Sequence, residues 1–146
     1  MPEYPKRRWS RLKEHDYSSD GYYFLTICTE NRKCILSSIL ADENQAAAVK
    51  LTPYGTVADR FVQSIPGIDK YVIMPNHIHM IIHKTNGKSI ASDVRSFKGL
   101  TTKTIGKSIW QDYYYDHIIR DEEDYLTKWN YIDGNPEKWL EDEYYT

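Results

Sequence analysis

An α+β fold is predicted for this chain, with an antiparallel sheet, helices packed on one face of it, and a further helix at the C-terminus. Segments rich in aromatic and β-branched residues alternate with segments in which apolar residues recur every three or four positions. Their order is β-α-β-β-α-β, which is the split βαβ arrangement of ferredoxin-like and RRM-like domains. The length of 146 residues suits one such domain, so we expect a single domain over residues 1–146.

The first strand is expected after a polar arm. Residues 1–20 are basic and contain Pro2 and Pro5, so they predict an irregular N-terminal arm. Residues 22–29 read YYFLTICT, and this aromatic and β-branched composition is typical of a strand. Residues 31–50 are mixed, and they predict either a loop or a short hairpin.

The first helix is expected to begin at Thr52 and Pro53, because threonine can cap a helix and proline suits the first turn. Pro66-Gly67 would end this segment. Its predicted buried side consists of Val57, Phe61 and Ile65.

Two strands, over residues 69–74 and 77–84, are predicted to meet at a tight corner formed by Pro75-Asn76. Asn86-Gly87 is a turn signal. A helix is expected over residues 89–105, ended by Gly106. Its predicted buried side consists of Ile90, Val94, Phe97 and Thr101.

The last strand is predicted over residues 110–119, and a helix follows it. Asp121 is suited to cap that helix, and Asp124 occupies the position of a capping-box acid. Pro136 limits the helix, because the residue before a proline is disfavoured in the α conformation. The predicted core stripe of this helix consists of Tyr125, Trp129 and Ile132.

The charges are unevenly distributed although the net charge is only -2. Basic residues gather in 1–15 and 84–107, and acidic residues gather in 122–124 and 141–143. Such a polarised surface can hold a phosphate chain on one side, although solvated helix faces give the same pattern. The candidate phosphate contacts are Arg95, Lys98 and Arg120. Tyrosine is frequent, at 13 residues, which suits base stacking but also ordinary strands and cores.

The sequence contains no apolar run near the roughly 20 residues of a membrane span, and no apolar segment follows the basic N-terminus as it would in a secretion signal. Cys28 and Cys34 form no CxxC pair, so we interpret them as reduced thiols of a cytoplasmic protein. We expect no membrane partner, and association with the nucleoid when DNA is bound.

Histidines occupy one face of the predicted strand over residues 77–84. Alternation places His77, His79 and His83 on one face, and the apolar residues Ile78, Met80 and Ile82 on the other. The Cα atoms of His77 and His79 would lie about 7 Å apart, so both imidazoles can reach one divalent metal. Imidazole with oxygen donors suits Mn²⁺ or Zn²⁺ better than Mg²⁺. The alternative is a pair of surface or hydrogen-bonded histidines.

The last helix carries Tyr131 and Asn135 one turn apart, about 100° around the helix from its core stripe. If this helix crosses the histidine face, the Asn135 amide oxygen can be a third metal ligand and the Tyr131 hydroxyl lies near a bound substrate. Asp133 would either assist the metal or stay solvated. The alternative is an amphipathic helix with a half-exposed tyrosine and an ordinary Asn-Pro stop.

These groups together suit the cleavage of a phosphodiester. A metal ion polarises a phosphate and orients it for in-line attack. A tyrosine nucleophile would form a phosphotyrosine ester, which conserves the energy of the broken bond. A 3′-hydroxyl can then reverse the step on another strand, which is strand transfer.

His77-Ile78-His79 resembles the HUH motif (His, hydrophobic, His) of single-strand DNA endonucleases. The longer string YVIMPNHIH at residues 71–79 resembles insertion-sequence-200-like transposases, and within them the REP-associated tyrosine transposase branch. The similarity spans about residues 7–142. Its other parts are Arg11-Leu12, Asp16-Tyr17, Tyr23-Phe24, Trp110-Gln111, the string YDHIIR at 115–120, and Tyr131-Ile132 before Asn135-Pro136.

The resemblance implies that His77 and His79 are metal ligands, that Asn135 is the third, and that Tyr131 is a nucleophile leaving a 5′-phosphotyrosine link and a free 3′-hydroxyl. It also implies an RRM-like fold, Mg²⁺ or Mn²⁺ as the metal, single-stranded DNA near imperfect hairpins as the substrate, and a possible homodimer. His83 and His117 are interpreted as structural or close to DNA.

Three other functions are compatible with parts of the sequence. The first is a domesticated protein of the same fold that binds hairpin DNA without transposition activity; the presence of all four site residues argues against it. The second is an RRM-like RNA binder, but the aromatic RNP1 pattern is missing. The third is a hydrolytic metalloenzyme using the two histidines, which leaves Tyr131 without a role.

Overall fold

The computed structural model describes residues 21–41, 47–85 and 89–146. The predicted arm over residues 1–20 and the turn at Asn86-Gly87 lie outside this part. The strands are β1 (Gly21–Cys28), β2 (Ser37–Ala41), β3 (Ala47–Leu51), β4 (Ile68–Ile73), β5 (His77–Lys84) and β6 (Tyr115–Ile118). The helices are α1 (Pro53–Val62), α2 (Ile90–Ile105) and α3 (Glu122–Gly134), with short 3-10 helices η2 (Glu30–Arg32) and η3 (Pro136–Glu141).

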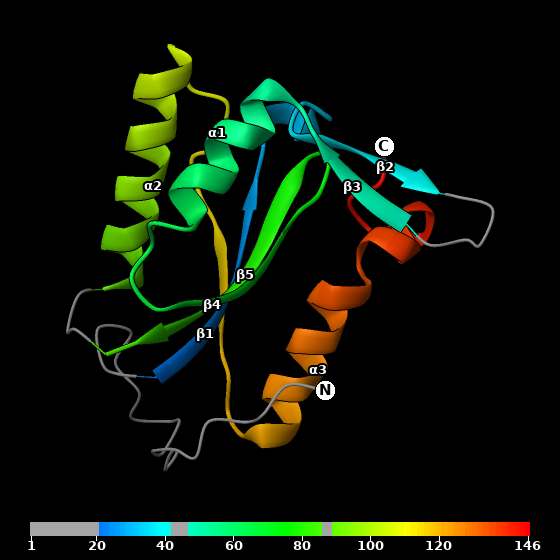
Figure 1. Ribbon diagram of the computed structural model, residues 1–146. Coiled ribbons are helices and arrows are strands. Elements are labelled where there is room, and N and C mark those ends of the chain that lie inside the picture. Colours follow the sequence, from blue (N-terminus) through cyan, green and yellow to red (C-terminus); the bar gives the residue numbers. More distant parts are fainter. Residues whose placement is uncertain (1–20, 42–46, 86–88) are drawn as a thin grey trace.

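Four strands form an antiparallel sheet in the order β4-β5-β1-β6, which confirms the predicted α+β fold. Helices α1 and α2 lie on one side of this sheet and α3 lies on the other (Figure 1). The remaining two strands, β2 and β3, pair with each other as a separate hairpin, so the segment 31–50 contains the predicted hairpin. None of the helices in the described segments has the length and hydropathy of a membrane span.

The larger core lies between the sheet and the helices α1 and α2. Ile78, Met80 and Ile82 of β5 face this core, as the alternation predicted. The predicted buried side of α2 is confirmed, because Ile90, Val94, Phe97 and Thr101 are all buried. Ser89 accepts a hydrogen bond from the backbone N–H of Ser92 at the start of α2, and Gly106 ends it in the left-handed conformation at φ 96°.

The predicted buried side of α1 is confirmed at Ile65, which lies in the larger core just after the helix, and is wrong at Val57 and Phe61. The helix buries Gly55, Ala58 and Val62, and leaves Val57 and Phe61 only partly buried. The reason is close packing at Gly55, where an added Cβ would overlap the Leu36 carbonyl oxygen ahead of β2. The helix therefore turns its smallest residue toward the hairpin. The predicted cap is confirmed, since the Thr52 hydroxyl accepts a hydrogen bond from the Gly55 N–H.

The last strand is shorter than predicted. Trp110 makes a single bridge with Thr29, and regular pairing with β1 begins at Tyr115. The indole N–H of Trp110 donates to the Thr101 hydroxyl, which fixes the ring against α2. The stretch around Trp110 is therefore held by this bridge, by the backbone hydrogen bond from Gln111 N–H to the Cys28 carbonyl and by side-chain contacts, and regular pairing begins only at Tyr115.

Helix α3 covers the other face of the sheet. Its smaller core consists of Tyr125 and Ile132 packed on Tyr22, Ile81 and Ile119. Asp121 caps the helix by accepting from the Asp124 N–H, as predicted. Trp129 is partly buried, and the Lys70 ammonium lies 3.8 Å from the centre of its ring. Because α3 lies on this face, it crosses the side of β5 that carries the histidines.

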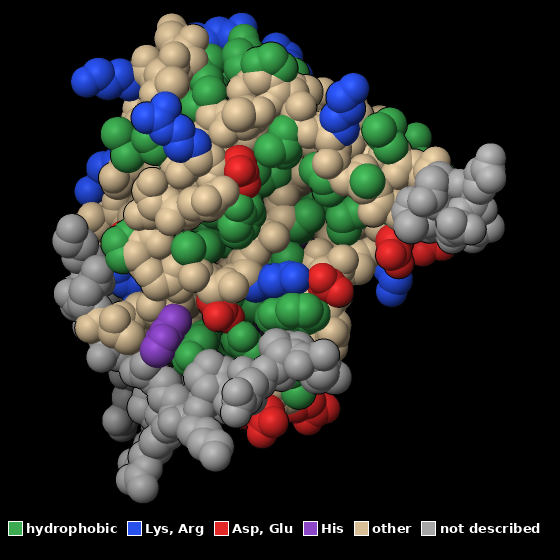
Figure 2. Space-filling view, in the orientation of Figure 1, with side chains coloured by type: hydrophobic (Ala, Val, Ile, Leu, Met, Phe, Trp, Pro, Cys, Tyr) green, Lys and Arg blue, Asp and Glu red, His purple; other side chains and the backbone are tan. Residues whose placement is uncertain are grey.

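Charged side chains are separated in space as well as in sequence. In Figure 2, Lys and Arg side chains gather over α1 and α2, and many Asp and Glu side chains lie toward α3. The first turn of α3 contributes Glu122, Glu123 and Asp124. The face that carries α3 is therefore not the most basic one among the described residues.

Candidate active site

Two buried histidines stand side by side on the α3 face of β5. His77 is 0% exposed and His79 is 2% exposed, and their ring centres are 4.5 Å apart. The register of the sheet pairs them with Cys28 and Thr26 of β1. Of the two alternatives to a metal site, a pair of surface histidines is therefore excluded, and a pair of buried, hydrogen-bonded histidines stays open.

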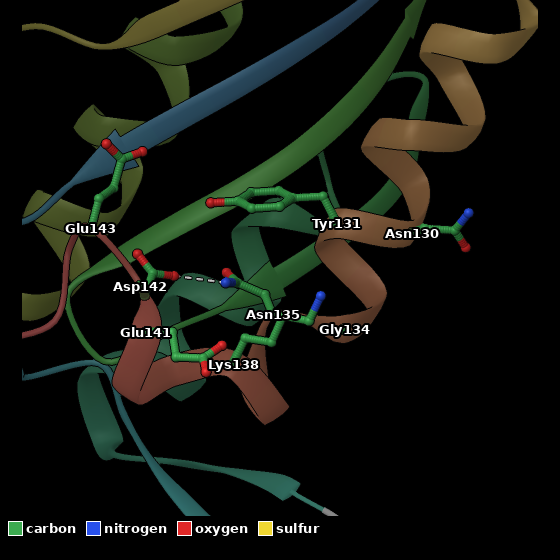
Figure 3. Close-up of a pocket in the computed structure, with 8 residues that line it drawn as sticks. All are labelled: Asn130, Tyr131, Gly134, Asn135, Lys138, Glu141, Asp142 and Glu143. Carbon is green, nitrogen blue, oxygen red and sulfur yellow. Dashed lines mark hydrogen bonds between the residues drawn. The ribbon is translucent and has the colours of Figure 1, made fainter.

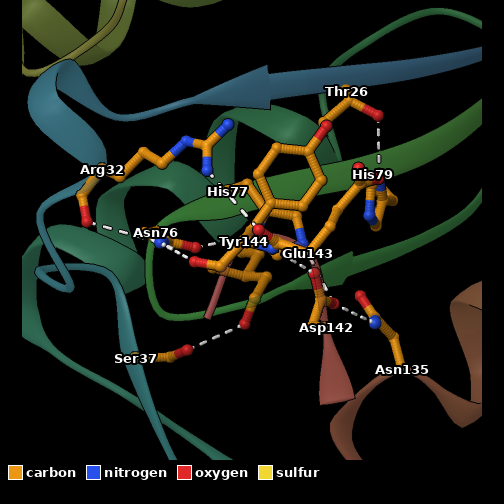
Figure 4. Close-up of polar contacts among 11 residues, drawn as sticks. Thr26, Arg32, Ser37, Asn76, His77, His79, Asn135, Asp142, Glu143 and Tyr144 are labelled. Atoms are coloured by element: carbon orange, nitrogen blue, oxygen red, sulfur yellow. Dashed lines mark hydrogen bonds and ion pairs between the residues drawn. The ribbon is translucent and has the colours of Figure 1, made fainter. Parts of the chain in front are cut away.

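Neighbouring side chains orient both rings. His77 Nδ1 lies 2.8 Å from the Asn76 side-chain oxygen, which can only accept, so Nδ1 carries the proton and Nε2 keeps a free lone pair. His79 Nδ1 lies 2.7 Å from the Thr26 hydroxyl (Figure 4). Hydrogen bonds of this type to the outer nitrogen are what fixes metal-binding histidines in proteins. Both Nε2 atoms are buried and have no hydrogen-bond partner.

Asn135 places a third buried atom beside them. The residue follows the last turn of α3 and is 3% exposed. Its side-chain N–H donates to the Asp142 carboxylate at 2.7 Å, and its side-chain oxygen is left without a partner. The same carboxylate lies 3.9 Å from His77 Nε2. The three predicted ligands thus each hold a buried polar atom that no protein group satisfies.

Burial keeps both imidazoles neutral. It lowers the pKa of His77 to about 4, against the opposing effect of the nearby Asp142 carboxylate. Burial also lowers the pKa of His79 well below its ordinary value, and the adjacent His77 adds to this. A histidine must be neutral to bind a metal, so both rings are in the required state at neutral pH.

The donor set fits a divalent cation. Two imidazole nitrogens, one amide oxygen and a nearby carboxylate match the preferences of Mn²⁺ and related ions. Within the described residues, no group of three His, Cys, Asp or Glu side chains is able to hold a metal, so a site here depends on the Asn135 amide. Asp133, the other candidate carboxylate, points away from the site and pairs with Lys70 at 2.9 Å.

Tyr131 lies beside the histidines and is accessible. It is 41% exposed, and its ring centre is 5.1 Å from that of His79. In Figure 3 the ring extends across a cavity of about 260 Å³ toward the segment that carries Asp142 and Glu143. Partial burial, followed by the charges of Asp142 and Glu143, raises the pKa of Tyr131 to about 12. The phenol is therefore protonated at neutral pH unless a cation is close to it.

No protein-family model matches the chain. An uncharacterised protein of Haemophilus influenzae is 35% identical over 95% of this chain and 93% of its own length. A REP-associated tyrosine transposase of Escherichia coli K12 is 30% identical over 84% of this chain and 70% of its own length. The chain belongs to the REP-associated tyrosine transposase family.

A solved structure supports this assignment. A REP-associated tyrosine transposase bound to a REP hairpin is similar to this chain with a TM-score of 0.60 and 25% identity, over 94% of this chain and 74% of that one. This member of the REP-associated tyrosine transposase family is therefore similar to other members in both sequence and fold.

Three residues at the candidate site were not predicted from the sequence. Thr26 and Asn76 orient the histidines, and Asp142 holds Asn135. Asn76 could have been found from its position next to His77 in the Pro75-Asn76 corner. No sequence pattern pointed to Thr26 or Asp142. Thr26 reaches His79 through the register of β1 and β5, and Asp142 reaches Asn135 because η3 turns the chain back.

The C-terminal segment after η3 lies against the histidines. The Tyr144 ring centre is 4.4 Å from that of His77, and the Asn76 side chain donates to the Tyr144 carbonyl at 2.6 Å. The Arg32 guanidinium lies 5.1 Å from the centre of the Tyr144 ring. The chain end thus closes one side of the site.

The predicted phosphate contacts are not gathered at the site. Arg95 is exposed on α2, on the opposite face of the sheet from Tyr131. Lys98 donates to the carbonyls of Gln111 and Tyr113, and burial lowers its pKa. Arg120 is exposed just before α3. Their contact with DNA stays a prediction.

The two remaining histidines of the sheet have other partners. His83 stacks on Tyr22 with ring centres 4.1 Å apart. His117 Nε2 lies 2.8 Å from the Asp124 carboxylate. Both lie outside the His77–His79 pair, and their role, whether structural or close to DNA, stays a prediction.

Proposed function

We propose that the chain is a transposase that cuts single-stranded DNA and rejoins it through a 5′-phosphotyrosine intermediate, with Mn²⁺ or Mg²⁺ as its metal. The observation that carries this proposal is the convergence of three unsatisfied buried atoms beside an accessible tyrosine. These atoms are Nε2 of His77, Nε2 of His79 and the side-chain oxygen of Asn135. Family membership independently supports a transposase.

A divalent metal held by these atoms would polarise the phosphate to be cut and favour the phenolate of Tyr131 by its charge. Neighbouring residues of the chain would orient the metal ligands. Thr26 and Asn76 hold the imidazoles with Nε2 turned inward, and Asp142 holds the Asn135 amide. A pre-oriented set of this kind costs little reorganisation when substrate binds.

Tyr131 is the proposed nucleophile. Its hydroxyl oxygen would bond to phosphorus as the bond from phosphorus to the 3′-oxygen breaks, so that the phenol loses its proton and the leaving 3′-oxygen gains one. The DNA end that keeps the phosphate stays attached through its 5′ side. Attack of a 3′-hydroxyl on this ester would release Tyr131 and complete strand transfer. Tyr131 lies beside the histidines of its own chain, so one chain contains every residue the scheme requires.

The proposed substrate is single-stranded DNA that contains a hairpin. A similar solved protein of this family is bound to a REP hairpin, and that supports the choice. A cavity of about 630 Å³ beside Tyr131 is also lined by the cationic side chains of Arg32 and Lys128, with one carboxylate, Glu143, among them. Positive charge at this place suits a phosphate chain.

The proposal is tested by covalent trapping. Labelled hairpin DNA from the region beside the gene is mixed with the protein and Mn²⁺ or Mg²⁺ and analysed on a denaturing gel. We expect a slow band that disappears with EDTA and with Tyr131→Phe. The matched control is Tyr145→Phe, a change at another exposed tyrosine, which should keep the band. An adduct that persists in Tyr131→Phe would make the nucleophile assignment wrong. Binding of hairpin DNA by folded protein without an adduct in either metal would favour the domesticated binding protein.

A further inference from the structure

Two exposed tyrosines contact each other near the candidate site. Among the described residues, four tyrosines are exposed large side chains: Tyr113, Tyr115, Tyr131 and Tyr145. The rings of Tyr113 and Tyr115 contact each other edge to face, with centres 5.5 Å apart, although they are 54% and 49% exposed. A pair of aromatic side chains that keeps half of its area in water is not a core feature.

Tyr115 lies in the same cross-strand row as His79, one of the candidate metal ligands. It pairs with Thr26 of β1, and Thr26 pairs with His79 of β5, so these three residues form one row across the sheet. Their side chains lie on the α3 face. Tyr115 therefore lies about two strand spacings, roughly 10 Å, from His79. The strand that carries it, β6, is an edge strand of the sheet formed by the described residues.

One cavity joins Tyr115 of this pair to the nucleophile. The cavity of about 630 Å³ is lined by the rings of Tyr115, Phe24 and Tyr131, and by the charged side chains of Arg32, Lys128 and Glu143. Aromatic walls with cations among them are the chemistry that single-stranded nucleic acid requires, since bases stack on rings and phosphates pair with cations. An apolar ligand would have no use for the cations, and an ordinary solvated surface would have no reason to expose the aromatic rings.

Lys98 fixes the segment that leads to the tyrosine pair. Its ammonium donates to the carbonyl oxygens of Gln111 at 2.6 Å and Tyr113 at 3.2 Å. The segment is thereby tied to α2 just ahead of Tyr115, where regular pairing with β1 begins. Tyr113 is held in place without being covered.

We propose that Tyr113 and Tyr115, with Phe24 on the adjoining cavity wall, stack unpaired DNA bases that flank the phosphate attacked by Tyr131. This inference rests on the proposed function and adds to it a binding site for single-stranded nucleotides beside the cut. Contacts with ring faces are tolerant of sequence, so this site holds the strand and does not read it.

The test compares two short probes in EDTA by fluorescence anisotropy: labelled oligothymidine, and an abasic oligomer of equal length with the same phosphates. The wild-type protein should bind oligothymidine more tightly. Tyr115→Ala should weaken oligothymidine binding roughly tenfold and leave abasic binding unchanged. Tyr115→Phe should retain the wild-type preference, because the ring and not the hydroxyl is required. The control Leu100→Ala, at an exposed residue of α2, should behave as wild type.

A second readout locates the bases. The fluorescence of 2-aminopurine next to the cut position in hairpin DNA should be quenched on binding and recover in Tyr115→Ala. Equal affinity of the wild type for both probes, or equal weakening of both by Tyr115→Ala, would overturn the stacking site. If covalent trapping succeeds while the probes show no base dependence, only this inference fails. If base-dependent binding occurs but no adduct forms with any metal, its placement beside a cut phosphate fails together with the proposed function.

Discussion

Three atoms define the candidate metal site at the residue scale: Nε2 of His77, Nε2 of His79 and the side-chain oxygen of Asn135. A buried polar atom without a hydrogen bond costs roughly 1–3 kcal/mol, and a bound cation removes that cost. Each atom is also oriented by a hydrogen bond on the far side of its group. Because no protein group satisfies these three atoms, metal binding should stabilise the folded protein.

We expect Mn²⁺ to raise the melting temperature. At a concentration one hundred times the dissociation constant, the gain is about 2.7 kcal/mol, which for a chain of this length is a shift of roughly 5–10 °C. His77→Ala should abolish the shift, because it removes one ligand and leaves the sheet otherwise intact. Thermal unfolding followed by circular dichroism, with and without Mn²⁺, measures it.

His117→Ala is the matched control for this prediction. His117 is a histidine of the same sheet that pairs with Asp124 and lies outside the candidate site. Its replacement should leave the Mn²⁺-dependent shift in place even if the starting melting temperature changes. A shift that His77→Ala retains in full would show that the metal binds elsewhere.

Local periodicity made part of the site predictable. His77 and His79 share a face because strand residues alternate, and Tyr131 and Asn135 share one because helix residues four apart are neighbours. Asp142 could not be predicted, because it reaches Asn135 only after η3 turns the chain back. Lys98 was predicted to contact phosphate because it belongs to a basic segment, and that pattern gave no sign that two backbone carbonyls accept hydrogen bonds from its ammonium.

At the scale of elements, α1 shows how packing overrides an apolar pattern. The pattern of Val57 and Phe61 pointed to one side of the helix, but the helix presents Gly55, Ala58 and Val62 to the core. The glycine allows the backbone of α1 to approach the Leu36 carbonyl closely. A backbone-to-backbone contact of this kind leaves no trace in hydrophobic periodicity.

Gly55→Ala should therefore destabilise the fold by about 1–3 kcal/mol, because the added methyl overlaps a backbone oxygen that cannot move freely. Gly99→Ala in α2 is the control, since nothing lies within 4 Å of an added Cβ there. That change should stabilise the protein by roughly 0.5–1 kcal/mol through helix propensity. Urea unfolding of both variants compares them, and a neutral Gly55→Ala would contradict the close contact.

At the scale of the whole molecule, the sheet has the larger hydrophobic core on one face and the candidate active site on the other. The larger core, with α1 and α2, lies on one face, and the histidines, Tyr131 and the tyrosine pair lie on the other. The order of strands and helices along the chain could be predicted, because most elements have a characteristic hydrophobic periodicity and recognisable end signals. The choice of α3 for the histidine face could be proposed only conditionally, since no local pattern states which face a final helix covers.

The most direct measurement of the central claim is to locate the DNA on the protein. Protein trapped with hairpin DNA in Mn²⁺ is digested with nuclease and protease, and the nucleotide-bearing peptide is sequenced by mass spectrometry. The chain contains 13 tyrosines, so the position is informative. We predict a 5′-linked nucleotide on Tyr131 alone. A nucleotide on any other residue, or a fully digested complex without an adduct, would contradict a tyrosine transesterification at Tyr131.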